Sequence, residues 1–233
     1  MPFYRNQRKS YSNVNIIDDK SSNEWENIID GIVYINLDTR PDRKVELLEN
    51  LKAYNIPSSM IHRIPAVYEK MCGHLGCSKS HIKALEYAEK QNWKRFLVLE
   101  DDFIFTESKS NIINNISKFY KDYNFDCLML AHGHLITNDT EIPYIKRIEY
   151  CTTASGYIVP KKYIPTLKQN MIEGLIKLEE EVVQLLDKNP NKKIYETSNA
   201  LDQYWNVLQK QDNWYLITVG KQSGTYSTIM GSI

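Results

Sequence analysis

Three consecutive acids directly follow a short apolar run in this sequence. The acids are Glu100, Asp101 and Asp102, and the run is Phe96–Leu99. Carboxylates this close repel one another unless a cation or a proton offsets their charge. A short apolar run of this kind is typical of a buried strand, and ligands of open α/β sheets bind beyond the carboxyl ends of such strands. The acids therefore indicate a site for a hard divalent cation completed by phosphate oxygens, with a solvated acidic turn as the plainer alternative.

A second segment suited to anion binding is Gly73–His81, where two glycines precede a helical pattern that Ser78 can cap. Glycine leaves backbone N–H groups free to approach a ligand, and a helix N-terminus attracts negative charge. Together with Arg40 and Arg43, this segment would surround the acids with phosphate-facing groups. The segment lacks the Gly-Lys-Ser/Thr of a Walker loop, and a simple capping loop remains an alternative.

Elements that could position these residues alternate along the chain. Short apolar runs predict strands, and apolar stripes at helical spacing predict helices between them. Strands are expected at 32–37, 96–99, 127–130, 157–159 and 214–219, and helices at about 39–54, 78–88, 112–120, 171–186 and 202–208. This alternation predicts an α/β fold with a mostly parallel central sheet flanked by helices.

Composition limits the classes of function. The 233 residues are 42% apolar and 25% charged, which suits a single globular domain. The 29 basic and 29 acidic residues give a net charge of +0, so no overall field would attract nucleic acid, and an anionic ligand needs a local site. The four cysteines lack paired Cys-x-x-Cys spacing for zinc and are expected to be reduced and mostly buried.

The N-terminal region is polar. Residues 1–27 show neither helical nor strand periodicity and are expected to form a tail or surface arm, with one domain over 28–233. No signal-peptide core or run of about 18 apolar residues occurs. The sequence thus predicts a cytoplasmic protein without a transmembrane segment, and a homodimer is compatible with it.

Several ordered motifs resemble glycosyltransferase family 25, which includes lipooligosaccharide and collagen hydroxylysine galactosyltransferases. The first four are Ile35-Asn36-Leu37-Asp38-x-Arg40-Pro41-x-Arg43, Arg63–Val67, Gly76-Cys77-x-x-Ser80-His81 and Leu99–Asp102. Later ones are Thr153–Val159, Ala200–Tyr204, and Gln222 with Ser227–Ile229. The resemblance spans about Gly31 to Ile229. It implies a nucleotide-diphospho-sugar-binding fold of the GT-A type and transfer of a hexose, with galactose expected, from a UDP-sugar with inversion at the anomeric carbon.

The resemblance also implies residues that hold the donor. The nucleoside would contact the end of the first strand and the loop that contains Ala66 and Val67, and an arginine would lie near the diphosphate. Asp102 would ligate Mn²⁺ or Mg²⁺, while Asp101 or Glu100 would contact ribose or a metal-bound water. No histidine follows His134, so metal binding would depend on Asp102 with water and phosphate. The expected nucleoside and phosphate residues are Asn36, Leu37, Asp38, Ala66, Val67, Ser80, and Arg40 or Arg43.

The sequence indicates fewer residues for binding and activating the acceptor than for holding the donor. An inverting displacement needs a base for the acceptor hydroxyl of a glycan or hydroxylysine, and Asp202 is the candidate. Asp202 is equally suited to be a helix N-cap. Trp205 and Tyr204 beside it are expected near a sugar. His132 and His134 could line the acceptor cleft, bind metal or be ordinary loop residues.

Two other classes of function remain open from the sequence. One is a non-catalytic module that binds a sugar nucleotide or a glycan with the same fold. The other is a metal-dependent phosphoester hydrolase, which normally needs acids from several strands to hold two ions. Only one acidic cluster is evident, so sugar transfer is favoured.

Overall fold

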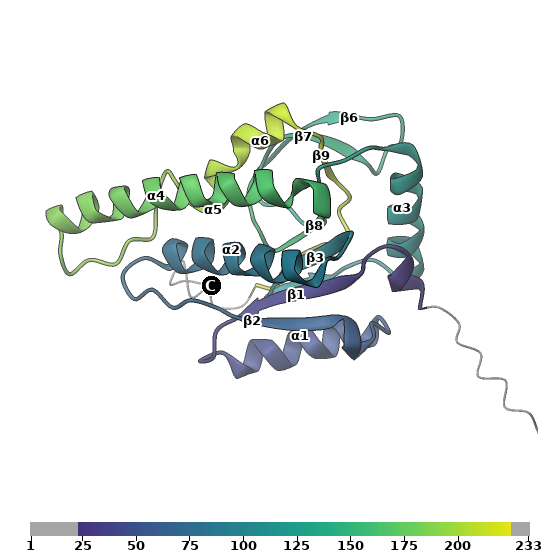
Figure 1. The fold of residues 1–233 in the computed structure, drawn as a ribbon, viewed down its shortest axis with the longest axis horizontal. Coiled ribbons are helices and arrows are strands. Elements are labelled where there is room, and N and C mark those ends of the chain that lie inside the picture. The colour runs from purple at the N-terminus through teal and green to yellow at the C-terminus, as the bar shows by residue number, and fades with distance from the viewer. Residues whose placement is uncertain (1–22, 225–233) are drawn as a thin grey trace, which may run out of the picture.

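A computed structural model describes residues 23–224. Its centre is an eight-stranded sheet in the order β2-β1-β3-β8-β5-β9-β7-β6, and a two-stranded sheet pairs β10 with β4 (Figure 1). The strands are β1 Gly31–Asn36, β2 Ile61–Pro65, β3 Arg95–Glu100, β4 Phe103–Phe105, β5 Cys127–Met129, β6 Leu135–Asp139, β7 Lys146–Cys151, β8 Gly156–Pro160, β9 Trp214–Leu216 and β10 Gly220–Gln222. The helices are η1 Glu24–Asn27, α1 Pro41–Ala53, η2 Ser58–Met60, α2 Gly73–Gln91, α3 Lys109–Asp122, η3 Lys161–Tyr163, α4 Ile164–Lys188, α5 Leu201–Tyr204 and α6 Asn206–Gln211.

The central sheet is mostly parallel. β1 pairs in parallel with β2 and β3, and β5 pairs in parallel with β9. Only β7 and β8 run against the other strands of this sheet, since each pairs antiparallel with its neighbours. The predicted α/β fold with a mostly parallel sheet flanked by helices is confirmed.

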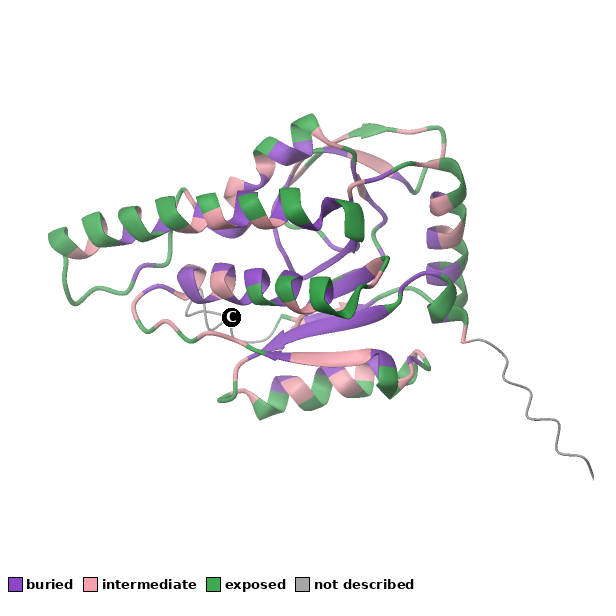
Figure 2. Ribbon diagram, in the orientation of Figure 1, coloured by how far each residue is buried: buried purple, intermediate pink, exposed green. Residues whose placement is uncertain are grey.

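Helices cover both faces of the sheet. Alternate side chains of β1 point to opposite faces, so Ile32 joins one core cluster and Val33 the other. The first cluster includes residues of α1 and α3, and the second includes residues of α2, α4 and α6. Figure 2 shows the inner strands buried and the outward helix faces exposed. Burial on both sides explains why β1 is an apolar run without alternation.

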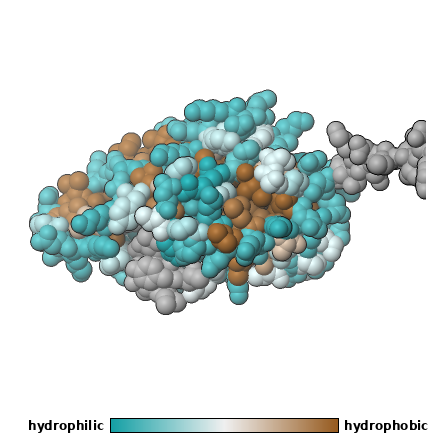
Figure 3. Space-filling model, turned by 90° about the horizontal axis from the view of Figure 1, so that it is seen from below, coloured by the Kyte–Doolittle hydropathy of each residue, from teal (hydrophilic) through white to brown (hydrophobic). Residues whose placement is uncertain are grey.

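On the face seen in Figure 3, hydrophobic residues gather in a few patches within a mostly hydrophilic surface. Among residues 23–224, no helix is both long enough and apolar enough to span a bilayer.

Helix α2 begins earlier than expected. It starts at Gly73, with Cys72 at its N-cap, so Ser78 is a buried residue within the helix and not its cap. The glycines therefore belong to the helix. A Cβ added to Gly76 would lie 2.3 Å from the Val67 carbonyl oxygen, so glycine permits the loop after β2 to pack against the first turn of α2.

The end of the chain also differs from the prediction. The expected strand at 214–219 is limited to β9, and the chain then forms β10, which pairs antiparallel with β4. The expected helix at 202–208 is divided into α5 and α6. The short strands β2, β4 and β10 and the β6–β7 hairpin were not predicted, because partly exposed strands of three to six residues have little apolar pattern.

The N-terminal boundary is a correction. Residues 24–27 were assigned to the polar tail, but they form η1, capped by the side chain of Asn23. Trp25 is 1% exposed and packs in the core against Phe105, and its indole N–H donates to the Tyr54 carbonyl oxygen. One large apolar side chain thus anchors a segment of polar composition. The rest of the expected tail, residues 1–22, lies outside the described residues.

Trp25→Ala is expected to lower the free energy of unfolding by about 3–5 kcal/mol, because it removes a fully buried indole and leaves a cavity. Urea denaturation measures the change. The matched control is Val45→Ala on α1, whose side chain is 54% exposed. A loss below about 1 kcal/mol for the tryptophan variant would show that η1 is not part of the folded core.

Candidate functional site

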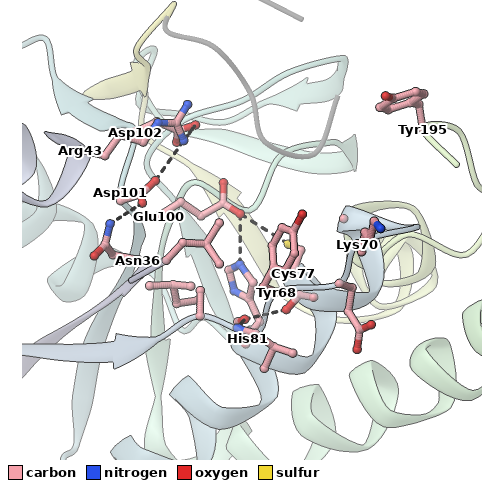
Figure 4. A pocket seen from close by; sticks show the side chains of 18 of the residues that line it. Asn36, Arg43, Tyr68, Lys70, Cys77, His81, Glu100, Asp101, Asp102 and Tyr195 are labelled. Carbon is pink, nitrogen blue, oxygen red and sulfur yellow. Dashed lines mark hydrogen bonds and ion pairs between the residues drawn. The ribbon is translucent and has the colours of Figure 1, made fainter. Parts of the chain in front are cut away.

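A pocket of about 300 Å³ lies where β1 and β3 end. Its walls come from these strand ends, the first turns of α2, residues 66–71 after β2, residues 193–195 and Gln222 of β10 (Figure 4). The parallel registers pair Ile35 with Glu100 and with Ile64, so the carboxyl ends of three neighbouring strands meet at this edge. The sheet topology therefore brings together segments that are far apart in sequence.

The acidic residues after β3 are held by a cation from α1. Arg43 Nη1 lies 3.0 Å from Asp101 Oδ1 and 3.3 Å from Asp102 Oδ2. Asn36 donates to the other oxygen of Asp101 at 2.7 Å. The side chains of these two acids are 11% and 12% exposed, so the ion pairs are largely shielded from solvent.

One arginine does not neutralise the cluster. Burial and the neighbouring Glu100 charge raise the pKa of Asp102 to about 7, even though Arg43 opposes the shift. Burial also raises the pKa of Asp101 against the effects of Asn36 and Arg43. Asp102 is therefore partly protonated near neutral pH, and the site has excess negative charge when it ionises.

Glu100 has different partners. His81 Nε2 lies 3.3 Å from Glu100 Oε1, and the Cys77 thiol donates to the same oxygen at 3.5 Å. Burial alone would raise the pKa of Glu100, but the hydrogen bonds and charges of its neighbours, His81 foremost, lower it. Burial, followed by the Glu100 charge, raises the pKa of the Cys77 thiol well above its usual range. His81 is fully buried and also bonds through Nδ1 to the Tyr157 hydroxyl at 2.8 Å.

The acids fit a divalent cation. Among residues 23–224, Asp102 Oδ1 is buried and has no hydrogen-bond partner, and burial together with the Glu100 charge raises the pKa of this carboxyl. An oxygen donor of this kind suits Mn²⁺ or Mg²⁺. Arg43 lies on the other oxygen of the same carboxylate, so an ion would share Asp102 with the arginine or displace it.

The structure brings most of the expected donor residues together. The pocket is lined by Asn36, Leu37, Arg43, Ala66, Val67, Ser80, Glu100, Asp101 and Asp102. Within this set Ser80 has a structural task, because its hydroxyl donates to the Gly76 carbonyl at 2.6 Å and accepts from the Val67 N–H at 2.8 Å. It fixes the loop after β2 against α2.

Only part of the last motif of the family pattern, Gln222 with Ser227–Ile229, lies among the described residues. Gln222 lines the pocket from β10. Residues Ser227–Ile229 lie outside the described residues.

Two expected donor residues lie elsewhere. Asp38 is 78% exposed and pairs with Arg63, and Arg40 pairs with Asp42 at 2.7 Å. Neither lines the pocket. Since Arg43 is turned inward between Asp101 and Asp102, it is the arginine of this segment that reaches the site.

Asp202 lies beside the pocket. It is in the first turn of α5, whose N-cap is Ala200, so the N-cap alternative is wrong. Its Oδ2 accepts from the Thr153 N–H at 2.9 Å, and its charge contributes to the raised pKa of Cys77. Thr153 has φ = 83°, a left-handed conformation that is strained for a β-branched residue. The strained backbone aims an N–H at the carboxylate and so fixes its orientation.

The aromatic and histidine candidates around Asp202 do not line this pocket. Trp205 is fully buried against Tyr157 and Trp214, which corrects its expected place near a sugar. Tyr204 packs against Gly174 of α4. His132 and His134 lie in the loop between β5 and β6, as the plainest of their three alternatives predicted.

Sequence reasoning missed the far wall of the pocket. Tyr68, Lys70 and Tyr195 lie across from Asp102 and Arg43 (Figure 4), with Lys193 beside them. Tyr68 and Tyr195 are 60% and 39% exposed, which is unusual for aromatic side chains and typical of ligand contacts. Tyr68 and Lys70 closely follow Ala66–Val67 in the sequence, and this proximity to an expected donor-binding motif could have identified them. Residues 193–195 are held at the pocket by a bridge that pairs Ile194 with Cys72 and by a contact of 2.9 Å between His74 Nε2 and the Tyr195 carbonyl oxygen.

Comparisons with known proteins agree with this geometry. Residues 68–184, half of the chain, match the sequence model of Glycosyltransferase family 25 (LPS biosynthesis protein). No curated protein sequence matches the chain.

Three solved structures illustrate the similarity of fold. A mannose-1-phosphate geranyltransferase from Thermus thermophilus has a TM-score of 0.48 at 10% identity, with 81% of this chain and 73% of that chain covered. A glycosyltransferase involved in glycosylation of the major capsid of PBCV-1 has a TM-score of 0.45 at 12% identity, covering 84% and 93%. Apo UDP-glucose pyrophosphorylase has a TM-score of 0.46 at 10% identity, covering 87% and 77%. At TM-scores below 0.5, these similarities support no inference about what this chain does.

The Asp102 pKa predicts a pH-dependent stability. The folded state binds the Asp102 proton up to about pH 7, whereas the unfolded chain releases it near the usual value of 3.8. Asp102 therefore destabilises the fold increasingly as the pH rises from about 4 to about 7. Asp102→Asn is uncharged, so its free energy of unfolding relative to the unchanged protein should rise by roughly 2–4 kcal/mol between about pH 4 and about pH 8. Urea titrations in chelator at both pH values measure this. A difference between the two proteins that does not change with pH would contradict the excess of negative charge.

Proposed function

Because the chain belongs to glycosyltransferase family 25 and is a sugar-transferring enzyme, we propose that it moves a hexose from a UDP-sugar to a hydroxyl group with inversion at the anomeric carbon. The observation that carries this proposal is the buried acidic cluster at the carboxyl end of β3, where one Asp102 oxygen has no hydrogen-bond partner within the described part of the chain. This cluster opens into the pocket at the ends of β1 and β3, where a donor diphosphate could meet it.

The nucleoside would occupy the wall formed by β1 and the loop after β2. Leu37, Ala66 and Val67 offer apolar and backbone surface there, and the exposed ring of Tyr68 provides a platform for a base. Ser80 holds this loop in place through two hydrogen bonds. The same residues would exclude water from the ribose and orient the diphosphate toward the acids.

The diphosphate would be held by positive groups that line the pocket. The N-terminus of the 19-residue helix α2 faces the pocket through Gly73 and Gly76, and Lys70 and Lys193 also line it. Asp102, with Asp101 beside it, would hold Mn²⁺ or Mg²⁺. The ion would neutralise charge on the departing UDP. Arg43 keeps both carboxylates oriented toward this position.

The acceptor hydroxyl would be deprotonated by Asp202. A fixed carboxylate can take this proton directly, and the Thr153 N–H orients the Asp202 carboxylate through Oδ2. The acceptor would enter from the side of α5. The family description as an LPS biosynthesis protein favours a glycan hydroxyl over hydroxylysine, and galactose is the proposed sugar.

A nucleotide panel tests the donor. UDP with Mn²⁺ at about 100 times its dissociation constant should stabilise the protein by ~2.7 kcal/mol, a rise in Tm of roughly 5–10 °C for a chain of this size. EDTA should remove most of the rise, and so should Asp102→Asn. Asp38→Asn is the matched control, because Asp38 lies outside the pocket. If no nucleotide raises the Tm in the presence of metal, the donor site is misassigned.

Paired variants test the base. Asp202→Asn can still accept the Thr153 N–H, so it should retain the fold and UDP binding while kcat falls by about 10²–10⁴-fold. Asp202→Ala loses that hydrogen bond as well and should also lower stability by about 1–3 kcal/mol. Transfer rates with saturating UDP-sugar and thermal melting separate the two effects. A kcat for Asp202→Asn within about threefold of the unchanged enzyme would remove Asp202 from the mechanism.

A further inference from the structure

Three chemically different metal-binding side chains converge at the base of the pocket. Cys77 and His81 are four residues apart on α2 and therefore lie on one face of the helix, toward Glu100 at the end of β3. The Cys77 sulfur and His81 Nε2 lie 3.5 Å and 3.3 Å from the same oxygen, Glu100 Oε1. All three candidate ligand atoms lie within 4.8 Å of one another.

The two separations from Glu100 Oε1 match the edges of a tetrahedral metal site. With zinc bonds of about 2.0 Å to nitrogen and oxygen and about 2.3 Å to sulfur, neighbouring ligand atoms lie about 3.3–3.5 Å apart. The two distances to Glu100 Oε1 fall in this range. One ion could thus be bound by all three groups with little movement of the backbone.

The surroundings orient the ligands. The Tyr157 hydroxyl lies 2.8 Å from His81 Nδ1 and leaves Nε2 directed at Glu100, the arrangement in which a second group fixes a metal-binding imidazole. Cys77, His81 and Glu100 all line the pocket, so an ion has an entry path and room for a fourth ligand from solvent or substrate (Figure 4).

We propose that Cys77, His81 and Glu100 form a second metal site that prefers Zn²⁺ and is distinct from the cation site at Asp102. A thiolate and an imidazole select the softer zinc ion over Mn²⁺ or Mg²⁺. Binding displaces the thiol proton, so one proton is released from Cys77 for each ion bound. The ion would also neutralise Glu100 and connect α2 to β3 beneath the donor pocket. This inference rests on side-chain geometry and does not depend on UDP-sugar being the donor.

Cobalt titration of chelator-treated protein, without nucleotide, tests the site. Co²⁺ replaces Zn²⁺ in tetrahedral sites and gives a thiolate-to-metal charge-transfer band only when a cysteine is a ligand. We expect one Co²⁺ per chain with this band, and displacement by Zn²⁺ but not by an equal concentration of Mn²⁺. Cys77→Ser should abolish the band and weaken Zn²⁺ binding, measured by calorimetry, by at least about tenfold.

Three controls keep the result interpretable. Cys72→Ser, at the N-cap of α2, should retain the band, as should Asp102→Asn. If Cys77→Ser does not fold, Glu100→Gln serves in its place and should weaken Zn²⁺ binding by a similar factor. The proposal is overturned by absence of the band, by a band that survives Cys77→Ser, or by a band lost in Asp102→Asn. Loss of UDP binding with the cobalt band intact would overturn the proposed function alone.

Discussion

Repulsion among three adjacent carboxylates constrains the structure around the end of β3. Each acid is stabilised in a different way: Asp101 by Arg43 and Asn36, Asp102 by Arg43 and partial protonation, and Glu100 by His81 and Cys77. The stabilising groups come from β1, α1 and α2, so these elements must converge on one sheet edge. The negative charge that remains after this pairing is the physical basis for binding a cation there.

The fold meets this constraint through close backbone contacts. Parallel pairing of β1 with β2 and β3 aligns the strand ends, and Gly76 allows the loop after β2 to lie directly against α2. Ser80 then joins that loop to the helix. As a result, the N-terminus of α2, the loop after β2 and the acids surround one pocket, and each contributes a different kind of interaction.

Burial gives this site its chemical character. An exposed acidic turn would be solvated and would have ordinary pKa values, whereas burial raises the pKa of Asp102 to about 7 and makes its charge depend on what binds. The same burial keeps Cys77 protonated until a metal replaces the proton. A single buried region would thus accommodate the two proposed sets of metal ligands, with hard oxygens toward the pocket and a softer set beneath them.

The sequence alone determined the fold class, the strand that carries the acids and nine of the 22 described residues that line the pocket, because buried strands appear as apolar runs and ordered motifs carry family information. It did not determine side-chain direction. Asp38 and Arg40 belong to the same motif as Asn36 and Arg43 yet do not line the pocket, and Trp205 follows Asp202 yet is buried in the core. Cysteine spacing gave no indication of zinc, since Glu100, the third member of the proposed zinc site, lies 19 residues beyond His81 along the chain. Long-range packing places such residues, and a local pattern records only which residues are neighbours along the chain.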